Sequence, residues 1–364
     1  MIKFLDLQKL NQPFEEKFQK KFCQFLKNGN YILGEEVSGF ETDFAKYCSN
    51  KFGIGVGNGL DAISLIFKAY IELGKLQKGD EVIVPANTFI ASIIAVLNAG
   101  LVPVLVEPRL ETYNINPELI KGHITNKTKA ILPVHLYGQM CEMDSINAIA
   151  QKHNLLVVED AAQAHGLKHN NLLAKHGNPK AYSFYPGKNL GALGDGGMVV
   201  TNDLKLAETV KKLSNYGTVR KYQNEYIGLN SRLDEIQAAF LIEKLPFLDQ
   251  ENNTRKQIAK RYLSEIHNDK IILPRVNGAD NHVFHLFVVR SQNRDELKEH
   301  LLKNNIESMI HYPIPPHKQN ALGKWNSLSL PITEKIHQEV LSLPNNSALT
   351  EGEVSKIISA VNAF

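Results

Sequence analysis

Two charged residues follow apolar segments at positions where they could take part in chemistry. The first, Asp160, comes after the apolar run 155–158 and precedes the small residues Ala161 and Ala162. In open α/β sheets, ligands bind beyond the carboxyl ends of the strands, so an acid at this place is a candidate binding residue. The alternative interpretation is that Asp160 only caps the next turn, which is a common role for an aspartate at the end of a strand.

The second charged residue, Lys188, lies between an apolar strand at 181–187 and a glycine-rich segment at 189–197. A lysine that is partly withdrawn from water is more often neutral, and a neutral amine can attack an aldehyde. The glycines would let the backbone pack closely around a bound group. Most lysines are solvated loop residues, and that interpretation stays open for Lys188 on spacing alone.

A third candidate is the glycine-rich segment from Gly53 to Gly59, which precedes a predicted helix that begins near Asp61. Unpaired N–H groups and the dipole at a helix start favour a phosphate group. No strong strand precedes this segment, and no acidic residue ends a second strand at the usual distance. The segment therefore resembles a dinucleotide fingerprint only loosely.

Other aromatic and basic residues could also line a site, among them Phe89, His135 and the segment 311–317. Each has a structural interpretation, because a phenylalanine is usually a core residue and a lone histidine is usually a satisfied interior residue. The histidines, cysteines and acids do not show the spacing of a metal site, and there is no Gly-x-Ser-x-Gly elbow.

The elements that must position these residues alternate between short apolar runs and segments of helical period. Strands are expected at 82–84, 103–106, 130–134, 155–158 and 198–200, and helices at 61–73, 91–99, 143–153 and 204–215. This alternation predicts an α/β fold with a mainly parallel sheet that is covered by helices on both faces.

The pattern changes after about residue 231, where longer helical segments begin, including 231–237 and 255–266. A strand is expected at 282–290 and a helix at 294–304. We therefore predict an N-terminal segment with a large domain over 1–247 and a small C-terminal domain over 248–364.

Composition is that of an ordinary globular protein of 364 residues, with 43% apolar residues. Lys and Arg total 41 against 38 Asp and Glu, and the two signs are interleaved, so no nucleic-acid partner is expected. Three widely spaced cysteines form neither a disulfide framework nor a metal pattern, which favours a reducing cytoplasm. The N-terminus lacks the pattern of a secretion signal, and the longest apolar stretch, 92–106, is broken by Asn98 and Gly100, so no membrane segment is expected.

Taken together and in order, several motifs resemble the DegT/DnrJ/EryC1/StrS family of sugar aminotransferases, which are fold-type I pyridoxal phosphate enzymes. The likeness covers nearly the whole chain, through segments 30–34, 85–89, 159–163, 183–191, 228–232 and 311–313. It implies an aspartate-aminotransferase-like fold, with a mainly parallel seven-stranded sheet between helices and a smaller α+β C-terminal domain.

The resemblance also implies how the cofactor would be held. Lys188 would form the Schiff base with pyridoxal phosphate, and Asp160 would pair with the pyridine nitrogen. The remaining cofactor contacts implied by the family are with Gly59, Leu60 and Ser183 at the phosphate, Phe89 and Ala162 on the two ring faces, Gln163 near the phenolic oxygen, and Asn230 from a neighbouring subunit. The last of these contacts implies a homodimer with shared active sites.

By the same likeness, the chain would transfer an amino group from L-glutamate to a nucleotide sugar, with pyridoxamine phosphate as the intermediate form of the cofactor. Segments 58–62, 85–92 and 281–287 look most like the enzymes that act at C3 of dTDP-3-keto-6-deoxyhexoses, in the synthesis of dTDP-3-amino-3,6-dideoxyhexoses. The nucleotide sugar would face Tyr31, Tyr185, Arg220, Lys221, Tyr222, His311 and Tyr312. The basic side chains among them would neutralise its diphosphate.

Three alternatives remain at this point. Many relatives that aminate C4 carry Ser-Gly-Thr where this chain has Asn58-Gly59-Leu60, so a C4 aminotransferase is the nearest one. Some relatives are dehydratases with a histidine in place of the lysine, and Lys188 argues against that reaction. A non-catalytic sensor would keep the fold and bind cofactor or nucleotide sugar without turnover.

Overall fold

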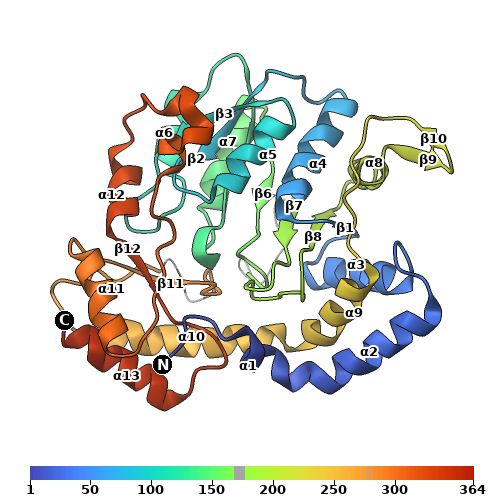
Figure 1. Cartoon of the computed structure of the whole chain (residues 1–364). Coiled ribbons are helices and arrows are strands. Elements are labelled where there is room, and N and C mark those ends of the chain that lie inside the picture. The colour runs from blue at the N-terminus through green and yellow to red at the C-terminus, as the bar shows by residue number, and fades with distance from the viewer. Residues whose placement is uncertain (168–176, 277, 279) are drawn as a thin grey trace.

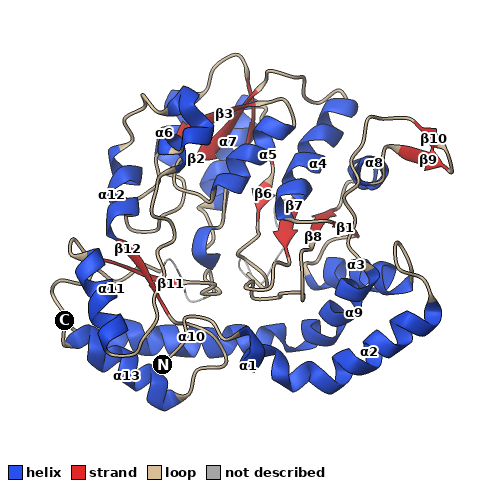
Figure 2. Cartoon of the chain, in the orientation of Figure 1, coloured by secondary structure: helices blue, strands red, loops and turns tan. Residues whose placement is uncertain are grey.

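The computed structural model describes residues 1–167, 177–276, 278 and 280–364. A central β-sheet forms the middle of the molecule (Figures 1 and 2). Its strands are β1 (Phe52–Val56), β2 (Glu81–Pro85), β3 (Val102–Val106), β4 (Thr128–Ile131), β5 (Leu156–Val157), β6 (Glu159–Asp160), β7 (Lys180–Ser183) and β8 (Gly197–Thr201). They pair in the orders β3-β2-β4-β5 and β6-β7-β8-β1.

The two rows of strands join through β5 and β6, which are separated only by Val158. The N–H of Val158 donates to the carbonyl of Ile131 at 3.0 Å, and the N–H of Asp160 donates to that of Pro133 at 2.9 Å, so the ladder continues across the gap. With β5 and β6 counted as one strand, the described residues form a seven-stranded sheet in which only β8 runs opposite to the others. The predicted fold class is confirmed.

Helices cover both faces of this sheet because side chains alternate between the faces along each strand. Val82 and Val84 pack into one core cluster with α4 (Gly59–Glu72), α5 (Ile90–Asn98) and α8 (Leu204–Ser214). Ile83, between them, packs into a second cluster with α7 (Met143–His153). Tyr182 and Val200 belong to a third cluster, with α3 (Glu35–Tyr47) and α9 (Glu235–Lys244).

A separate core lies in the C-terminal part of the chain. It joins α10 (Leu248–Glu265), α11 (Arg294–Lys303), α13 (Glu351–Asn362) and the antiparallel pair of β11 (Phe287–Arg290) and β12 (Val340–Leu343), and it includes Ile2. Leu248, at the start of α10, packs with α3 and α9 instead. Helix α10 therefore spans both cores along the lower edge of Figure 1, and the domain boundary between 247 and 248 stays a prediction.

The remaining elements lie at the periphery or connect the two cores. They are α1 (Leu7–Asn11), α2 (Glu15–Asn28), α6 (Pro117–Ile120), α12 (Pro331–Glu339) and the hairpin of β9 (Thr218–Arg220) and β10 (Gln223–Asn224). The hairpin stands away from the sheet at the right of Figure 1.

Two expectations about strands are corrected by the structure. A strand, β1, does run through Gly53 and leads to the glycine-rich turn; a Cβ atom at Gly53 would lie 2.5 Å from the carbonyl oxygen of Glu41, so α3 packs too closely for a side chain there. The segment 282–286 is not a strand. Its backbone bonds instead to the turn at 137–138, because Val283 donates to Gly138 at 2.9 Å and Leu286 to Tyr137 at 3.2 Å.

The ion pair between Arg290 at the end of β11 and Glu339 at the end of α12 is buried, with 2.7 Å between Nη1 and Oε2. We expect Arg290→Met to lower the free energy of unfolding by about 3–5 kcal/mol, because the buried carboxylate of Glu339 then keeps only its longer contact of 3.9 Å with the half-exposed Lys335. Urea unfolding followed by circular dichroism measures this change. The matched control is Lys75→Met, which breaks an exposed pair with Asp203 and should cost less than about 1 kcal/mol. Equal effects of the two substitutions would contradict this prediction.

Candidate active site

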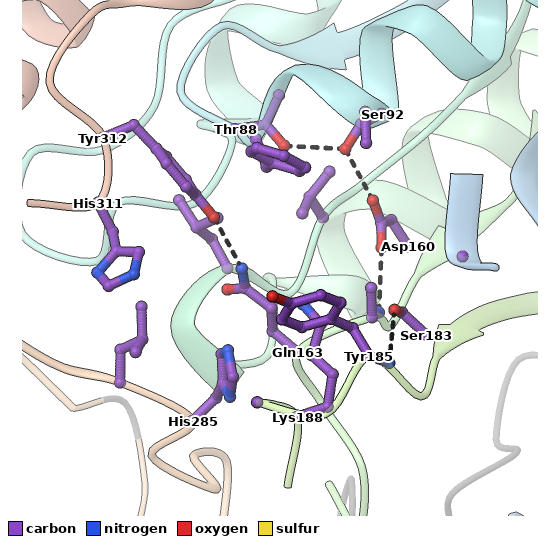
Figure 3. A pocket seen from close by; sticks show the side chains of 18 of the residues that line it. Thr88, Ser92, Asp160, Gln163, Ser183, Tyr185, Lys188, His285, His311 and Tyr312 are labelled. Atoms are coloured by element: carbon purple, nitrogen blue, oxygen red, sulfur yellow. Dashed lines mark hydrogen bonds between the residues drawn. The ribbon is translucent and has the colours of Figure 1, made fainter. Parts of the chain in front are cut away.

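A cavity of about 690 Å³ opens at the carboxyl end of the parallel strands. The turn before α4 lines it, together with the start of α5 and the segments that follow β6 and β7. The opposite wall comes from the C-terminal part of the chain and the N-terminal segment, through Phe4, Leu5, Arg255, His285, Met309, His311, Tyr312 and Asn345. Figure 3 shows side chains from both walls pointing into this space.

Lys188 lies in the loop after β7, where its backbone N–H donates to the carbonyl of Tyr185 at 2.8 Å. Its side chain lines the cavity. Burial lowers the pKa of Lys188 to about 8, although the negative charge of Asp160 opposes this shift. A sizeable fraction of this amine is therefore neutral near neutral pH, as a nucleophile or a base requires.

Asp160 ends β6 and is only 6% exposed. The hydroxyl of Ser92 donates to its Oδ2 at 2.7 Å, and the N–H of Ala162 donates to its Oδ1 at 3.1 Å. Ser92 is in turn within 2.9 Å of the hydroxyl of Thr88, as the dashed lines in Figure 3 show. Burial raises the pKa of Asp160, whereas the two hydrogen bonds and the charge of Lys188 lower it.

The start of α4 lines one side of the cavity. Asn58 caps the helix by accepting from the N–H of Asp61 at 2.8 Å. Gly59 is the first residue of the helix and lies against Ser183; a Cβ atom at this position would be 2.7 Å from the Cβ of Ser183. Only glycine therefore leaves this side of the cavity open, with helix N–H groups and a hydroxyl nearby.

Ala162 and the rings of Phe89 and Tyr312 also line the cavity, and the two ring centroids lie 5.2 Å apart. The side chain of Gln163 donates to the hydroxyl of Tyr312 at 3.1 Å. A small residue and two flat rings in one cavity suit a planar ligand.

Most of the predicted site residues meet in this one cavity. Those that line it are Gly59, Leu60, Phe89, Asp160, Ala162, Gln163, Ser183, Tyr185, Lys188, His311 and Tyr312. Five others do not line it in the single chain, namely Tyr31, Arg220, Lys221, Tyr222 and Asn230. All five are exposed, and Tyr222 of the β9–β10 hairpin is 89% exposed. Their roles stay predictions.

His135 is satisfied inside the protein and does not line the cavity. Its Nε2 lies 3.0 Å from a carboxylate oxygen of Glu159, and its Nδ1 accepts from the N–H of Cys141 at 3.2 Å. The structural interpretation of this histidine is therefore the correct one.

Several residues that line the cavity were not among the site residues predicted from the sequence. Ser92 lies in the first turn of α5, and its hydroxyl is 2.9 Å from that of Thr88, which precedes the helix. His285, Arg255 and Asn345 come from distant segments, and only the folded chain brings them to Lys188.

The described residues contain no group of three or more His, Cys, Asp and Glu side chains that could hold a metal ion. Within the same described ranges, none of the helices is both long and apolar enough to cross a membrane.

Comparison with known proteins places the chain among aminotransferases. The model of the DegT/DnrJ/EryC1/StrS aminotransferase family matches residues 13–362. The chain is 52% identical over 365 residues to the dTDP-3-amino-3,6-dideoxy-alpha-D-galactopyranose transaminase of Aneurinibacillus thermoaerophilus, and the match covers 100% of this chain and 99% of that protein.

Solved structures agree with this match. DesV of S. venezuelae superimposes with a TM-score of 0.95 at 42% identity, with 99% of this chain and 97% of that chain covered. NtdA of Bacillus subtilis, solved with bound cofactor PMP, superimposes with a TM-score of 0.91 at 33% identity, with 98% and 83% covered. This chain therefore belongs to the DegT/DnrJ/EryC1/StrS aminotransferase family.

Proposed function

We propose that this protein is a pyridoxal phosphate-dependent aminotransferase that moves an amino group from L-glutamate to C3 of a dTDP-3-keto-6-deoxyhexose. The observation that carries this proposal is that one cavity is lined both by the buried Asp160 and by Lys188, whose amine has a lowered pKa. The family to which the chain belongs depends on this cofactor, and a related structure holds its PMP form.

The residues present fit pyridoxal phosphate. The close approach of Gly59 and Ser183 suits the phosphate, the part of the cavity lined by Phe89 and Ala162 suits the ring, and Asp160 suits a protonated pyridine nitrogen. When bound, the cofactor supplies an electron sink that stabilises negative charge at a carbon losing a proton. The residue that would hold it covalently is Lys188.

Lys188 then has a second task as a base and an acid. In the first half-reaction, its released amine takes the proton from the α-carbon of the amino donor. In the second half-reaction, it returns a proton to C3 of the sugar. A pKa of about 8 suits both directions, because the neutral and charged forms are then both available near neutral pH.

When the cofactor is bound, Asp160 would face its pyridine nitrogen and favour the protonated form. The carboxylate is buried and accepts one hydrogen bond from Ser92 and one from the N–H of Ala162. Its oxygens keep further lone pairs for a cationic partner. Burial strengthens that electrostatic attraction, because little water competes for either group.

The nucleotide sugar would enter past Tyr185, His311 and Tyr312 of the same chain. The five exposed residues that do not line this cavity fit a second role, in which a partner subunit presents them to the site. Arg220 and Lys221 would then face the diphosphate, and Asn230 the cofactor phosphate. The proposed active form is thus a homodimer with shared sites.

The choice of C3 rests on the sequence of the cofactor cradle and on similarity to a named C3 transaminase. Asn58 caps α4 beside Gly59, where many C4 enzymes carry Ser-Gly-Thr. The relative that is 52% identical over the full chain carries a name that specifies a dTDP-3-amino-3,6-dideoxygalactose product.

The substrate prediction is tested by incubating the purified holoenzyme with L-glutamate and three sugars: both C4 epimers of a dTDP-3-keto-6-deoxyhexose, and a dTDP-4-keto-6-deoxyhexose. We expect product with nitrogen at C3, identified by mass spectrometry and NMR. Lys188→Ala should lose at least about 10⁴-fold in rate, because it removes both the covalent anchor and the base. The matched control is Lys51→Ala, at an exposed lysine outside the cavity. Turnover of only the 4-keto sugar would remove the C3 assignment, and cofactor binding without any turnover would favour a sensor.

A pH prediction follows from the environment of Lys188. When pyridoxal phosphate is added to the cofactor-free protein, only the neutral amine reacts, so the rate of attachment should rise with pH and level off above about 8. The growth of the visible absorbance band measures this rate. A rate that still rises steeply near pH 10.5, the ordinary lysine pKa, would show that Lys188 is not desolvated.

Burial raises the pKa of Asp160, and the hydrogen bond from Ser92 should partly offset this effect by lowering it. Ser92→Ala removes a contact that lowers this pKa, so the carboxyl should take up a proton at higher pH and pair less well with the ring nitrogen. We expect kcat to fall about tenfold with KM little changed, the loss typical of a hydrogen bond to a charged group. The acidic limb of the kcat profile should move to higher pH. Ser92→Thr keeps the hydroxyl and is the control; identical pH profiles for the alanine variant and the wild type would refute the role.

A further inference from the structure

Arg255 is a second cation in the cavity besides Lys188. The basic side chains that line the cavity in the described part of the chain are Lys188, Arg255, His285 and His311. Burial lowers the pKa of His311 to about 4 and that of His285 well below its ordinary value, so both rings are neutral at neutral pH. Burial lowers the pKa of Arg255 only to about 10, so its guanidinium stays charged.

Among the residues that the structure describes, no carboxylate forms a close pair with this guanidinium. Arg255 is 3% exposed, and its Nη1 donates to the backbone carbonyl of Asn345 at 2.6 Å. Its Nε has no hydrogen-bond partner, and no described carboxylate forms an ion pair with it within 4.0 Å. The attraction it receives comes from Glu251 on the same helix, beyond ion-pair distance. A buried charge without a close counter-charge is costly, which suggests that the counter-charge comes from a ligand.

Asn189, the residue after Lys188, connects the reacting lysine to the helix that carries Arg255. The side chain of Asn189 donates to that of Asn252 on α10 at 2.8 Å, and it also meets the Nδ1 of His285 at 3.0 Å. Arg255 is three residues after Asn252, on the same face of α10 and about one turn along. Figure 3 shows His285 beside Lys188, and burial together with the charges of Lys188 and Arg255 lowers the pKa of His285, so Arg255 lies close to the reacting amine.

We propose that Arg255 binds a carboxylate of the amino donor. This inference rests on the proposed function, in which an α-amino acid brings its nitrogen to Lys188. A guanidinium pairs with a carboxylate through two parallel hydrogen bonds and recognises its plane as well as its charge. The carbonyl of Asn345 holds Nη1 of Arg255, and the side chain of Arg255 lines the cavity in which the donor would bind.

The diphosphate of the sugar is the competing ligand for this cation, and the structure favours the donor. Tyr185, proposed to face the nucleotide sugar, is 59% exposed at the cavity wall, whereas Arg255 is deeply buried. A small dicarboxylic amino acid suits such a position better than a diphosphate that bridges two large groups. Arg255 is therefore a determinant of donor choice.

The test measures the two half-reactions separately in the holoenzyme by stopped-flow absorbance. We expect Arg255→Gln to lower kcat/KM for L-glutamate by at least about 30-fold, the loss typical of a buried charged hydrogen bond. The second half-reaction, with the dTDP-keto sugar, should change by less than about threefold. Arg255→Lys keeps the charge without the planar fork and should lose about tenfold in the donor half-reaction only.

The matched control is Arg261→Gln, which removes a guanidinium from the same helix outside the cavity, where it pairs with Glu265 at 2.8 Å. It should leave both half-reactions unchanged. Loss confined to the sugar half-reaction, equal loss in both, or no loss in the glutamate half-reaction would each overturn the proposal.

Binding of glutarate, a dicarboxylate without an amine, gives a readout that needs no turnover. Calorimetry should show that Arg255→Gln weakens glutarate binding by at least about tenfold relative to wild type and to Arg261→Gln. If Arg255→Gln does not fold, Arg255→Lys gives the same comparison, and unchanged glutarate affinity overturns the proposal. Failure of the wild type to react with either substrate would refute the proposed function instead, while the glutarate comparison still decides the role of Arg255.

Discussion

The carboxylate of Asp160 is withdrawn from water at the end of a central parallel strand, and much of the site is arranged around that constraint. Its two oxygens are held by Ser92 and by the N–H of Ala162, and Ser92 is itself held by Thr88. Thr88 and Ser92 follow β2 in the chain, whereas Ala162 follows β6. These donors reach the carboxylate because the carboxyl ends of β2 and β6 lie at the same edge of the sheet, on either side of β4.

The same edge explains the other fixed parts of the cavity. Helix α4 begins where β1 ends, and it approaches β7 so closely that only glycine fits at residue 59. The loop after β7 then carries Lys188 toward Asp160, and the opposite charges act on each other's pKa. Gly59 at the start of α4, Lys188 and Asp160 are thus placed at one cavity by the ends of β1, β7 and β6, with β8 between β1 and β7, before any residue of the C-terminal core contributes.

The second core supplies the wall that faces the substrates. Helix α10 packs its first turn with the large core and its later turns with the C-terminal core, and it carries Arg255 between them. Tyr312 and Gln163 join the two sides through a hydrogen bond. In the proposed function, residues at the sheet edge therefore hold the cofactor. Residues where the two cores meet select the donor and the sugar.

Much of this could be predicted from the sequence alone. The alternation of apolar runs and helical segments determined the α/β class, and the family motifs determined the strand count and the cluster around Lys188 and Asp160. The strand expected at 282–290 was partly wrong, since contacts with the distant turn at 137–138 decide the path of its first half. Only the tertiary structure decided that Arg255 is a buried cation without a close carboxylate and that His135 is an interior residue paired with Glu159. Periodicity and motifs reflect neighbours along the chain, whereas burial and pairing depend on segments that meet only after folding.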